Sequence, residues 1–429
     1  MNRFPILFLI LLFSLSCSLD TKSNLWKDET EEKVSQTKEI FETTTIIKTE
    51  FNQNIKINLK ESFNSKNPTQ NINNNKGYLN FDSNLKKLAN FNFSKVKNFE
   101  NRNQELVFTD NNQIIFAEDK GSIIKINSEF KKIWKVNHYS KSEKKSNPTL
   151  FFGIYNNKLI VADTISKIYS IDLKSGNLIW KKNSSAPFNS QIKILKDRFY
   201  VVDLKNVLRC YSIKDGSEIW NFKSESTFIN SPRKLSLIID DEKVIFINSL
   251  GDITAVDAEK GSLLWQTPTQ RNSLIEDAFS LKNSDLVLSK KRIFFSNNKN
   301  EFFSIDSTNG LIRWKQNIKS DLSPSIIGNL IFTITNDGFL VIIDADNGNI
   351  IRITYIFDKL KDKKIKAEGF FVGKNFVYTN INNGQILKTK ISDGRSIDFY
   401  KLGGGRYLKS YINNKNLFVL KSNSLLKLN

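Results

Sequence analysis

The chain has 429 residues, with 64 Lys and Arg against 44 Asp and Glu and a formal net charge of +20 at pH 7. It contains no long apolar run after its N-terminus, so we expect one large domain without membrane-spanning helices. The positive charge would suit nucleic acid, anionic lipid or an acidic protein surface. However, the basic residues are scattered, and Lys, Asn, Ile and Phe are abundant together, as an A+T-rich coding sequence produces. We therefore expect no nucleic-acid binding.

Residues 1–16 have the layout of a signal peptide. The apolar core from Phe4 to Leu15 is about 18 Å long as a helix, too short for a hydrocarbon layer of ~30 Å. Ser16 before Cys17 resembles the lipobox of bacterial lipoproteins, in which the cysteine is acylated, although the residue three positions before it is not aliphatic. The resemblance implies a lipid anchor at Cys17, and Ser18 implies sorting to the outer membrane. The alternative is a plain secretory signal with an incidental cysteine.

Residues 17–76 are rich in Ser, Thr, Asn, Lys and Glu and have too few apolar residues to form a core. We interpret them as a lipid-anchored flexible tether. Short apolar stretches such as Ile55 to Leu59 are the exception, since they could add a strand or dock on a partner.

A repeated unit follows, in which an alternating strand leads to Asp, three residues, Gly, three residues and Trp. Complete copies carry Asp172, Gly176 and Trp180; Asp257, Gly261 and Trp265; and Asp306, Gly310 and Trp314. An early copy, one residue shorter, ends at Trp134, and a partial copy keeps Gly216 and Trp220. Two degenerate copies keep Gly348 and Gly394 but have Arg352 and Asp398 in place of Trp. The Gly-to-Gly spacings of 40, 45, 49, 38 and 46 residues indicate a repeat array.

Each unit predicts a β-hairpin. The alternating residues on both sides of the turn predict two strands, Gly supplies the positive φ that closes the turn, and Asp accepts backbone N–H bonds there. Trp then lies on the second strand, where it can pack between adjacent sheets. Further apolar runs upstream of each hairpin, such as Lys158 to Ala162 and Val244 to Ile247, give four strands per repeat.

Residues 77–429 are therefore predicted to form an all-β, eight-bladed β-propeller of four-stranded antiparallel blades. Seven hairpins precede a last pair of strands, Asn416 to Leu420 and Ser424 to Leu428. A strand within Leu79 to Phe93 is free to complete this blade and close the ring. At about 44 residues per blade the length fits such a ring. The alternative is an open solenoid.

The sequence is poor in catalytic groups. It has one histidine, His138, which we interpret as a surface residue, and no nearby residues have metal-ligand spacing. Cys210 aligns with Ser170 and Ser304 of other repeats and is interpreted as a small packed side chain. With Cys17 in a targeting segment, no disulfide within the chain is expected.

The Asp-x-x-x-Gly-x-x-x-Trp units resemble the repeats of quinoprotein propellers. That family includes dehydrogenases, which commonly carry a vicinal Cys pair and acidic calcium ligands near a quinone, and members that bind no cofactor. This chain lacks the second cysteine, so we expect no cofactor and no metal. With a lipoprotein signal, a tether and eight blades, it resembles the BamB family of scaffold lipoproteins, which bind the periplasmic domains of BamA in the outer-membrane β-barrel assembly machinery.

The resemblance to the BamB family also implies contact loops after the third and fourth Trp-marked hairpins. These loops correspond to residues 224–233 and 266–283, and the first lacks the Leu-Ser-Leu-Arg stretch of familiar members. The residues implied in partner binding are Phe228, Ile229, Arg233, Arg271, Ile275, Glu276 and Asp277. Alternatively, these loops are ordinary connections between blades.

The resulting hypothesis is a monomeric, non-catalytic scaffold that is anchored in the outer membrane and faces the periplasm. It would bind BamA, and unfolded outer-membrane proteins are a second candidate class of partner. Two alternatives remain open: a quinone-dependent propeller enzyme and a periplasmic glycan-binding lipoprotein.

Overall fold

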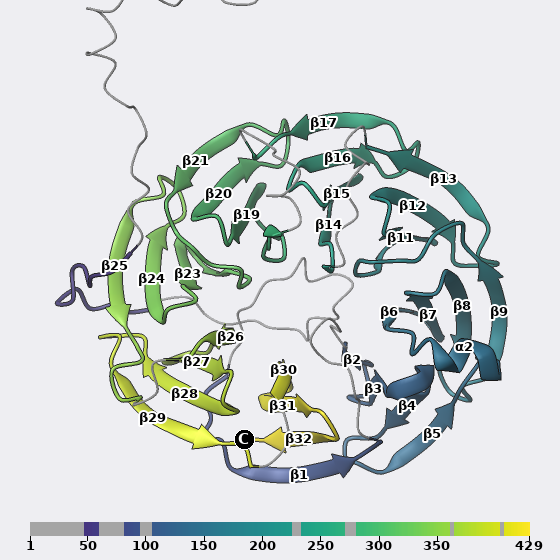
Figure 1. Cartoon of the computed structure of the whole chain (residues 1–429), viewed down its shortest axis with the longest axis horizontal. Coiled ribbons are helices and arrows are strands. Elements are labelled where there is room, and N and C mark those ends of the chain that lie inside the picture. Colours follow the sequence, from purple (N-terminus) through teal and green to yellow (C-terminus); the bar gives the residue numbers. More distant parts are fainter. Residues whose placement is uncertain are drawn as a thin grey trace, which may run out of the picture. The chain divides into compact units, whose positions relative to one another are not determined.

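The computed structural model describes residues 47–59, 81–94, 105–224, 233–270, 280–360, 364–403 and 407–429. All of them belong to one compact unit, residues 46–429. They form eight antiparallel sheets of four strands arranged in a ring (Figure 1). The predicted eight-bladed β-propeller is therefore confirmed.

The first four blades follow one another in chain order. The first contains β2 (Val107–Phe108), β3 (Ile114–Ala117), β4 (Ile123–Ile126) and β5 (Lys132–Val136). The second contains β6 (Leu150–Tyr155), β7 (Lys158–Asp163), β8 (Lys167–Asp172) and β9 (Leu178–Asn183). The third contains β10 (Lys193–Leu195), β11 (Arg198–Val202), β12 (Val207–Ser212) and β13 (Glu218–Lys223). The fourth contains β14 (Leu237–Asp240), β15 (Lys243–Ile247), β16 (Ile253–Asp257) and β17 (Leu263–Thr267).

The other four blades complete the ring. The fifth contains β18 (Val287–Ser289), β19 (Arg292–Asn297), β20 (Glu301–Asp306) and β21 (Ile312–Gln316). The sixth contains β22 (Ser325–Ile327), β23 (Leu330–Ile334), β24 (Phe339–Asp344) and β25 (Ile350–Tyr355). The seventh contains β26 (Ala367–Val372), β27 (Phe376–Ile381), β28 (Gln385–Lys390) and β29 (Ser396–Lys401). The eighth contains β30 (Tyr407–Asn413), β31 (Asn416–Lys421), β32 (Ser424–Leu428) and β1 (Lys87–Asn92).

Helical structure is sparse in the described part of the chain. A 3-10 turn covers Asp119–Gly121, and α2 covers Lys141–Lys145 with a capping box between Ser140 and Glu143. No helix among the described residues is long and apolar enough to cross a membrane.

The blades are held together by apolar contacts between neighbouring sheets. In each blade the first strand lies nearest the axis and the fourth forms the rim (Figure 1). The second and third strands are buried almost throughout, as in β7, whereas rim strands such as β9 are largely exposed. One core cluster, for example, joins Ile245 of the fourth blade with Phe295 and Phe303 of the fifth. The core is thus a ring of interfaces between blades.

The ring is closed by a strand from the N-terminal side of the propeller. β1 pairs with β32 in antiparallel register, with Asn90 opposite Leu426 and Asn92 opposite Ser424. It forms the rim strand of the eighth blade, so that blade combines the two ends of the propeller (Figure 1). The closing strand that was expected within Leu79 to Phe93 is present.

Residues 47–59 differ from the expectation of a flexible tether over 17–76. They lie against the propeller, where Phe51 and Ile353 exchange backbone hydrogen bonds of 3.1 and 3.0 Å. Ile57 is buried in the core of the sixth and seventh blades. Part of the expected tether therefore belongs to the folded body.

Candidate partner-binding face

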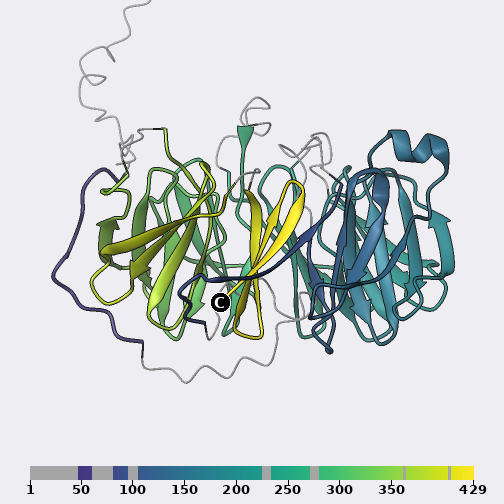
Figure 2. The same ribbon diagram turned by 90° about the horizontal axis from the view of Figure 1, so that it is seen from below.

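The propeller has two faces that differ in the loops they carry. Because the strands of a blade alternate in direction, its second-to-third turn and its connection to the next blade lie on one face, which we call the connection face. The Asp-Gly turns lie on the opposite face, the motif face. Figure 2 shows the blades between these two faces from the side. Both predicted contact loops follow rim strands, β13 and β17, and these strands end at the connection face.

The inner ends of the two predicted loops are joined to each other and to the body. Leu286, after the second loop, donates its N–H to the Ser236 hydroxyl after the first, at 2.9 Å. The Arg233 carbonyl accepts a 2.6 Å bond from the Asn189 amide, and Leu235 donates its N–H to the Asn189 carbonyl at 2.7 Å. Hydrogen bonds between neighbouring blades therefore hold the inner, C-terminal ends of both loops close together.

Of the predicted partner-binding residues, the structure describes Arg233, which is exposed. The others, Phe228, Ile229, Arg271, Ile275, Glu276 and Asp277, lie outside the described residues, as does Cys17. Their roles remain predictions from the sequence.

A group of four charged side chains and one tyrosine, buried or half-buried, lies near the propeller axis at the connection face. Its members, Glu105, Lys193, Lys234, Asp285 and Tyr411, are here called the axial cluster. They lie in or just before the innermost strands of five different blades and interact electrostatically, so they meet on the axis. The Lys234 ammonium lies 2.5 Å from the Glu105 carboxylate, and both side chains are more than nine-tenths buried.

Burial also shapes the charge state of the axial cluster. It lowers the pKa of Lys193 to about 8, while the nearby Asp285 and Glu105 carboxylates act in the opposite direction. Burial raises the pKa of Tyr411, and the Glu105 carboxylate adds to that effect. The cluster therefore places opposite charges close together beside the inner ends of the predicted loops.

The axial residues do not fit the calcium-bound quinone of the dehydrogenases. A calcium site needs several oxygen ligands that are free to turn toward the ion. Here Glu105 is ion-paired with Lys234, and the Lys193 ammonium lies close enough to interact electrostatically with both the Glu105 and the Asp285 carboxylates. Within the described ranges, no three His, Cys, Asp or Glu side chains are grouped so that they could hold a metal ion.

The sequence carries a signal for the axial cluster, although the prediction of blades and loops did not include it. A charged residue directly precedes the apolar inner strand in several repeats, as in Glu105-Leu106, Lys193-Ile194, Lys234-Leu235 and Asp285-Leu286. One charge per repeat looks like an ordinary loop residue. Only the ring brings these charges together.

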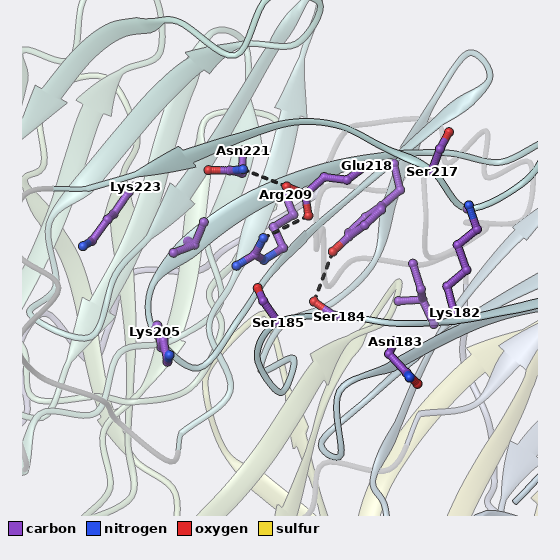
Figure 3. A pocket seen from close by; sticks show the side chains of 14 residues that line it. Lys182, Asn183, Ser184, Ser185, Lys205, Arg209, Ser217, Glu218, Asn221 and Lys223 are labelled. Carbon is purple, nitrogen blue, oxygen red and sulfur yellow. Dashed lines mark hydrogen bonds and ion pairs between the residues drawn. The ribbon is translucent and has the colours of Figure 1, made fainter.

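A polar cavity of about 870 Å³ lies between the second and third blades (Figure 3). Arg209 projects into it from β12 and binds the buried Asp203 carboxylate at 2.8 Å and the Glu218 carboxylate at 2.9 Å. Three lysines also line the cavity: Lys182, Lys205 and Lys223. Lys223 is followed directly by the first predicted loop, so this loop begins beside a net positive cavity.

His138 and Cys210 are not arranged as catalytic groups. Burial raises the pKa of the Cys210 thiol to about 12, and its side chain is fully buried opposite Trp220. The His138 ring lies 3.1 Å from the Gly176 carbonyl, and burial lowers its pKa. The interpretation of Cys210 as a packed side chain agrees with this position, whereas His138 is half-buried rather than a surface residue.

The chain matches a protein-family model described as outer membrane protein assembly factor BamB over residues 102–354, more than half of its length. An uncharacterised protein of Rickettsia conorii is 23% identical over 319 residues, which cover 72% of this chain and 74% of that protein. The outer membrane protein assembly factor BamB of Shewanella oneidensis is 20% identical over 221 residues, which cover 45% of this chain and 53% of that protein.

Solved structures show where the fold recurs. The structure of BamB from Moraxella catarrhalis covers 80% of this chain and 99% of its own, with a TM-score of 0.65 and 13% identity. A quinohemoprotein alcohol dehydrogenase from Comamonas testosteroni covers 82% of this chain and 78% of its own, with a TM-score of 0.62 and 11% identity. At such identities the likeness shows the fold alone. The family match is the more specific finding, and by it the chain belongs to the BamB-like family of PQQ-repeat β-propellers.

Proposed function

We propose that this protein is a non-catalytic scaffold lipoprotein of the outer-membrane β-barrel assembly machinery. Cys17 would anchor it in the outer membrane, and its connection face would bind the periplasmic domains of BamA. The observation that carries the proposal is the BamB family match over residues 102–354. The connection face supports it, because two neighbouring blades bring the inner, C-terminal ends of both implied contact loops together there.

The chemistry of this face suits a protein partner. Phe228, Ile229 and Arg271 are the kinds of side chain that anchor protein interfaces, and Glu276 and Asp277 would supply a polar rim. The lysines of the cavity beside the first loop favour acidic side chains on the partner. If an edge strand of the partner pairs here, backbone hydrogen bonds would add affinity that depends little on sequence.

The test combines Phe228→Ala with Asp277→Ala in the full-length protein. The loss of one apolar anchor and one charged rim residue should weaken BamA binding at least about a hundredfold, chiefly through Phe228, because a few central residues dominate such interfaces. The melting temperature should stay nearly unchanged. The control pair, Leu311→Ala with Glu259→Ala, removes similar side chains from exposed positions of the motif face and should leave binding intact.

Each other outcome has a definite meaning. Unchanged binding in the double variant would move the interface to another face, and parallel loss of binding and stability would make these residues packing residues. If detergent-solubilised membranes yield BamA without this protein, the scaffold proposal is wrong. Dye reduction that depends on added quinone and calcium would instead support the alternative, a quinone-dependent propeller enzyme.

A further inference from the structure

Five of the eight blade junctions share one contact. The indole N–H of the repeat Trp donates to a main-chain carbonyl of the following blade at 3.1–3.3 Å. The pairs are Trp134 with Leu173, Trp180 with Ile213, Trp220 with Ala258, Trp265 with Ser307 and Trp314 with Ala345. The sixth blade has Arg352 at the Trp position. Its junction with the seventh blade must be closed in another way.

Arg352 makes the same junction contact and adds a new one. Its side chain is fully buried, and Nη2 donates at 2.7 Å to the carbonyl of Ile391, which occupies the position of the carbonyls that accept from the indoles. Nη1 donates to the Ser392 carbonyl at 2.7 Å and to the Ile55 carbonyl at 3.0 Å. A guanidinium has more donors than an indole, and here the extra donor binds the N-terminal segment.

The N-terminal segment 47–59 binds alongside Arg352 as an extended peptide. Phe51 pairs with Ile353 of the rim strand β25 by two backbone hydrogen bonds, and Glu50 accepts a 2.8 Å bond from the Tyr355 N–H. Farther along, Ile57 donates its N–H to the Ser392 carbonyl at 2.9 Å and buries its side chain between the two blades. The segment thus bridges the sixth and seventh blades.

The other rim strands provide an internal comparison. Leu263 and Leu264, two and three residues after the motif Gly of the fourth blade, are 50% and 46% exposed. Ile350 and Ile351 hold the same positions in the sixth blade and are only partly exposed. Ile47 packs into the same cluster as Ile350. The two apolar residues after the motif Gly, which are exposed in the fourth blade, are therefore partly covered by the N-terminal segment in the sixth blade, where Arg352 replaces Trp.

We propose that β25 and the turn after β28 form a binding site for an extended peptide, that residues 47–59 occupy it in cis, and that Arg352 is its recognition residue. At this junction the hydrogen bond from Arg352 to the Ile391 carbonyl takes the place of the Trp contact. Because the segment is attached to the same chain, its effective concentration at the site is on the order of millimolar. An external peptide should therefore bind only when the segment is released.

The first test measures hydrogen exchange in the full-length protein. The Phe51, Ile57 and Ile353 amides should be protected in the wild type. They should exchange at least about tenfold faster in Arg352→Met, because the Ile55 carbonyl of the segment then loses the guanidinium that donates to it. Arg313→Met removes an exposed Arg from the neighbouring rim strand and should leave these amides unchanged. Unprotected amides in the wild type, or equal protection in a folded Arg352→Met protein, would overturn the proposal.

The second test does not depend on the folding of an Arg352 variant. Phe51→Pro with Ile57→Ser removes a backbone donor and an apolar anchor from the segment and leaves the blades unaltered. A labelled synthetic peptide with the natural residues 46–59 should bind this full-length variant at least about tenfold more tightly than the wild type, as measured by fluorescence anisotropy. Equal binding to the two proteins, or binding to neither, would contradict a cis-occupied site.

Discussion

The repeat Trp residues of this propeller contact the blade that follows their own. Trp220 contacts Gly261 and donates to the Ala258 carbonyl of the fourth blade. Trp220→Ala should therefore lower the free energy of unfolding by about 3–5 kcal/mol, as for other packed aromatic residues. Its neighbour Ile219 is 44% exposed on the same strand, so Ile219→Ala should cost less than about 1 kcal/mol. Urea unfolding of both variants measures the difference, and equal costs would contradict the junction role.

Asp163 gives the stability a specific pH dependence. Burial raises its pKa to about 6, against 3.8 without burial, although Tyr139 donates a hydrogen bond to it. Between pH 6 and 4 the folded state therefore retains a proton that the unfolded state has lost, and stability rises as the pH falls. Relative to Asp163→Asn, the wild type should gain up to about 3 kcal/mol across this window. A pH-independent difference between the two proteins would mean that Asp163 titrates normally.

At the scale of one element, the Gly of a motif turn is constrained twice: by its positive φ and by the Trp ring of the preceding blade that packs against it. Gly216 has φ +71°, and a Cβ there would lie 2.5 Å from the Trp180 ring. Gly384 has φ +79° but would meet nothing within 4 Å. Gly384→Ala should therefore cost about 1 kcal/mol for the positive φ alone, and Gly216→Ala at least twice as much. Thermal unfolding compares them, and equal losses would show that the Trp contact adds nothing.

The elements were predictable from the sequence where the signal is local. Apolar runs marked strands such as β7 and β15, and the repeat spacing indicated the blades. The role of Arg352 was not predictable, because its partner Ile55 lies about three hundred residues away and an Arg at a Trp position looks like decay of the repeat. The axial cluster was not predictable for the same reason, since each of its charges belongs to a different blade.

At the scale of the whole molecule, the docked segment changes the reach of a lipid anchor. If Cys17 is acylated, at most residues 18–46 separate the anchor from the docked segment, rather than the whole of 17–76. Twenty-nine residues span at most about 100 Å when fully extended, roughly half of what the longer tether would allow. The propeller would then stay closer to the membrane, which favours a partner whose binding domains also lie near it.

The anchor itself is tested by a matched pair of cysteine variants. Cys17→Ser should move the full-length protein from the membrane fraction to the soluble periplasm and abolish the mass added by acylation. More than one acyl chain is expected, because a single chain binds a bilayer only marginally. Cys210→Ser is the control, since Cys210 is buried and the equivalent positions Ser170 and Ser304 show that a hydroxyl fits there. It should remain membrane-bound and folded. Membrane retention of Cys17→Ser, with no acyl mass on the wild type, would mean that residues 1–16 act as a plain secretory signal and that the propeller is held at the membrane through its partner alone.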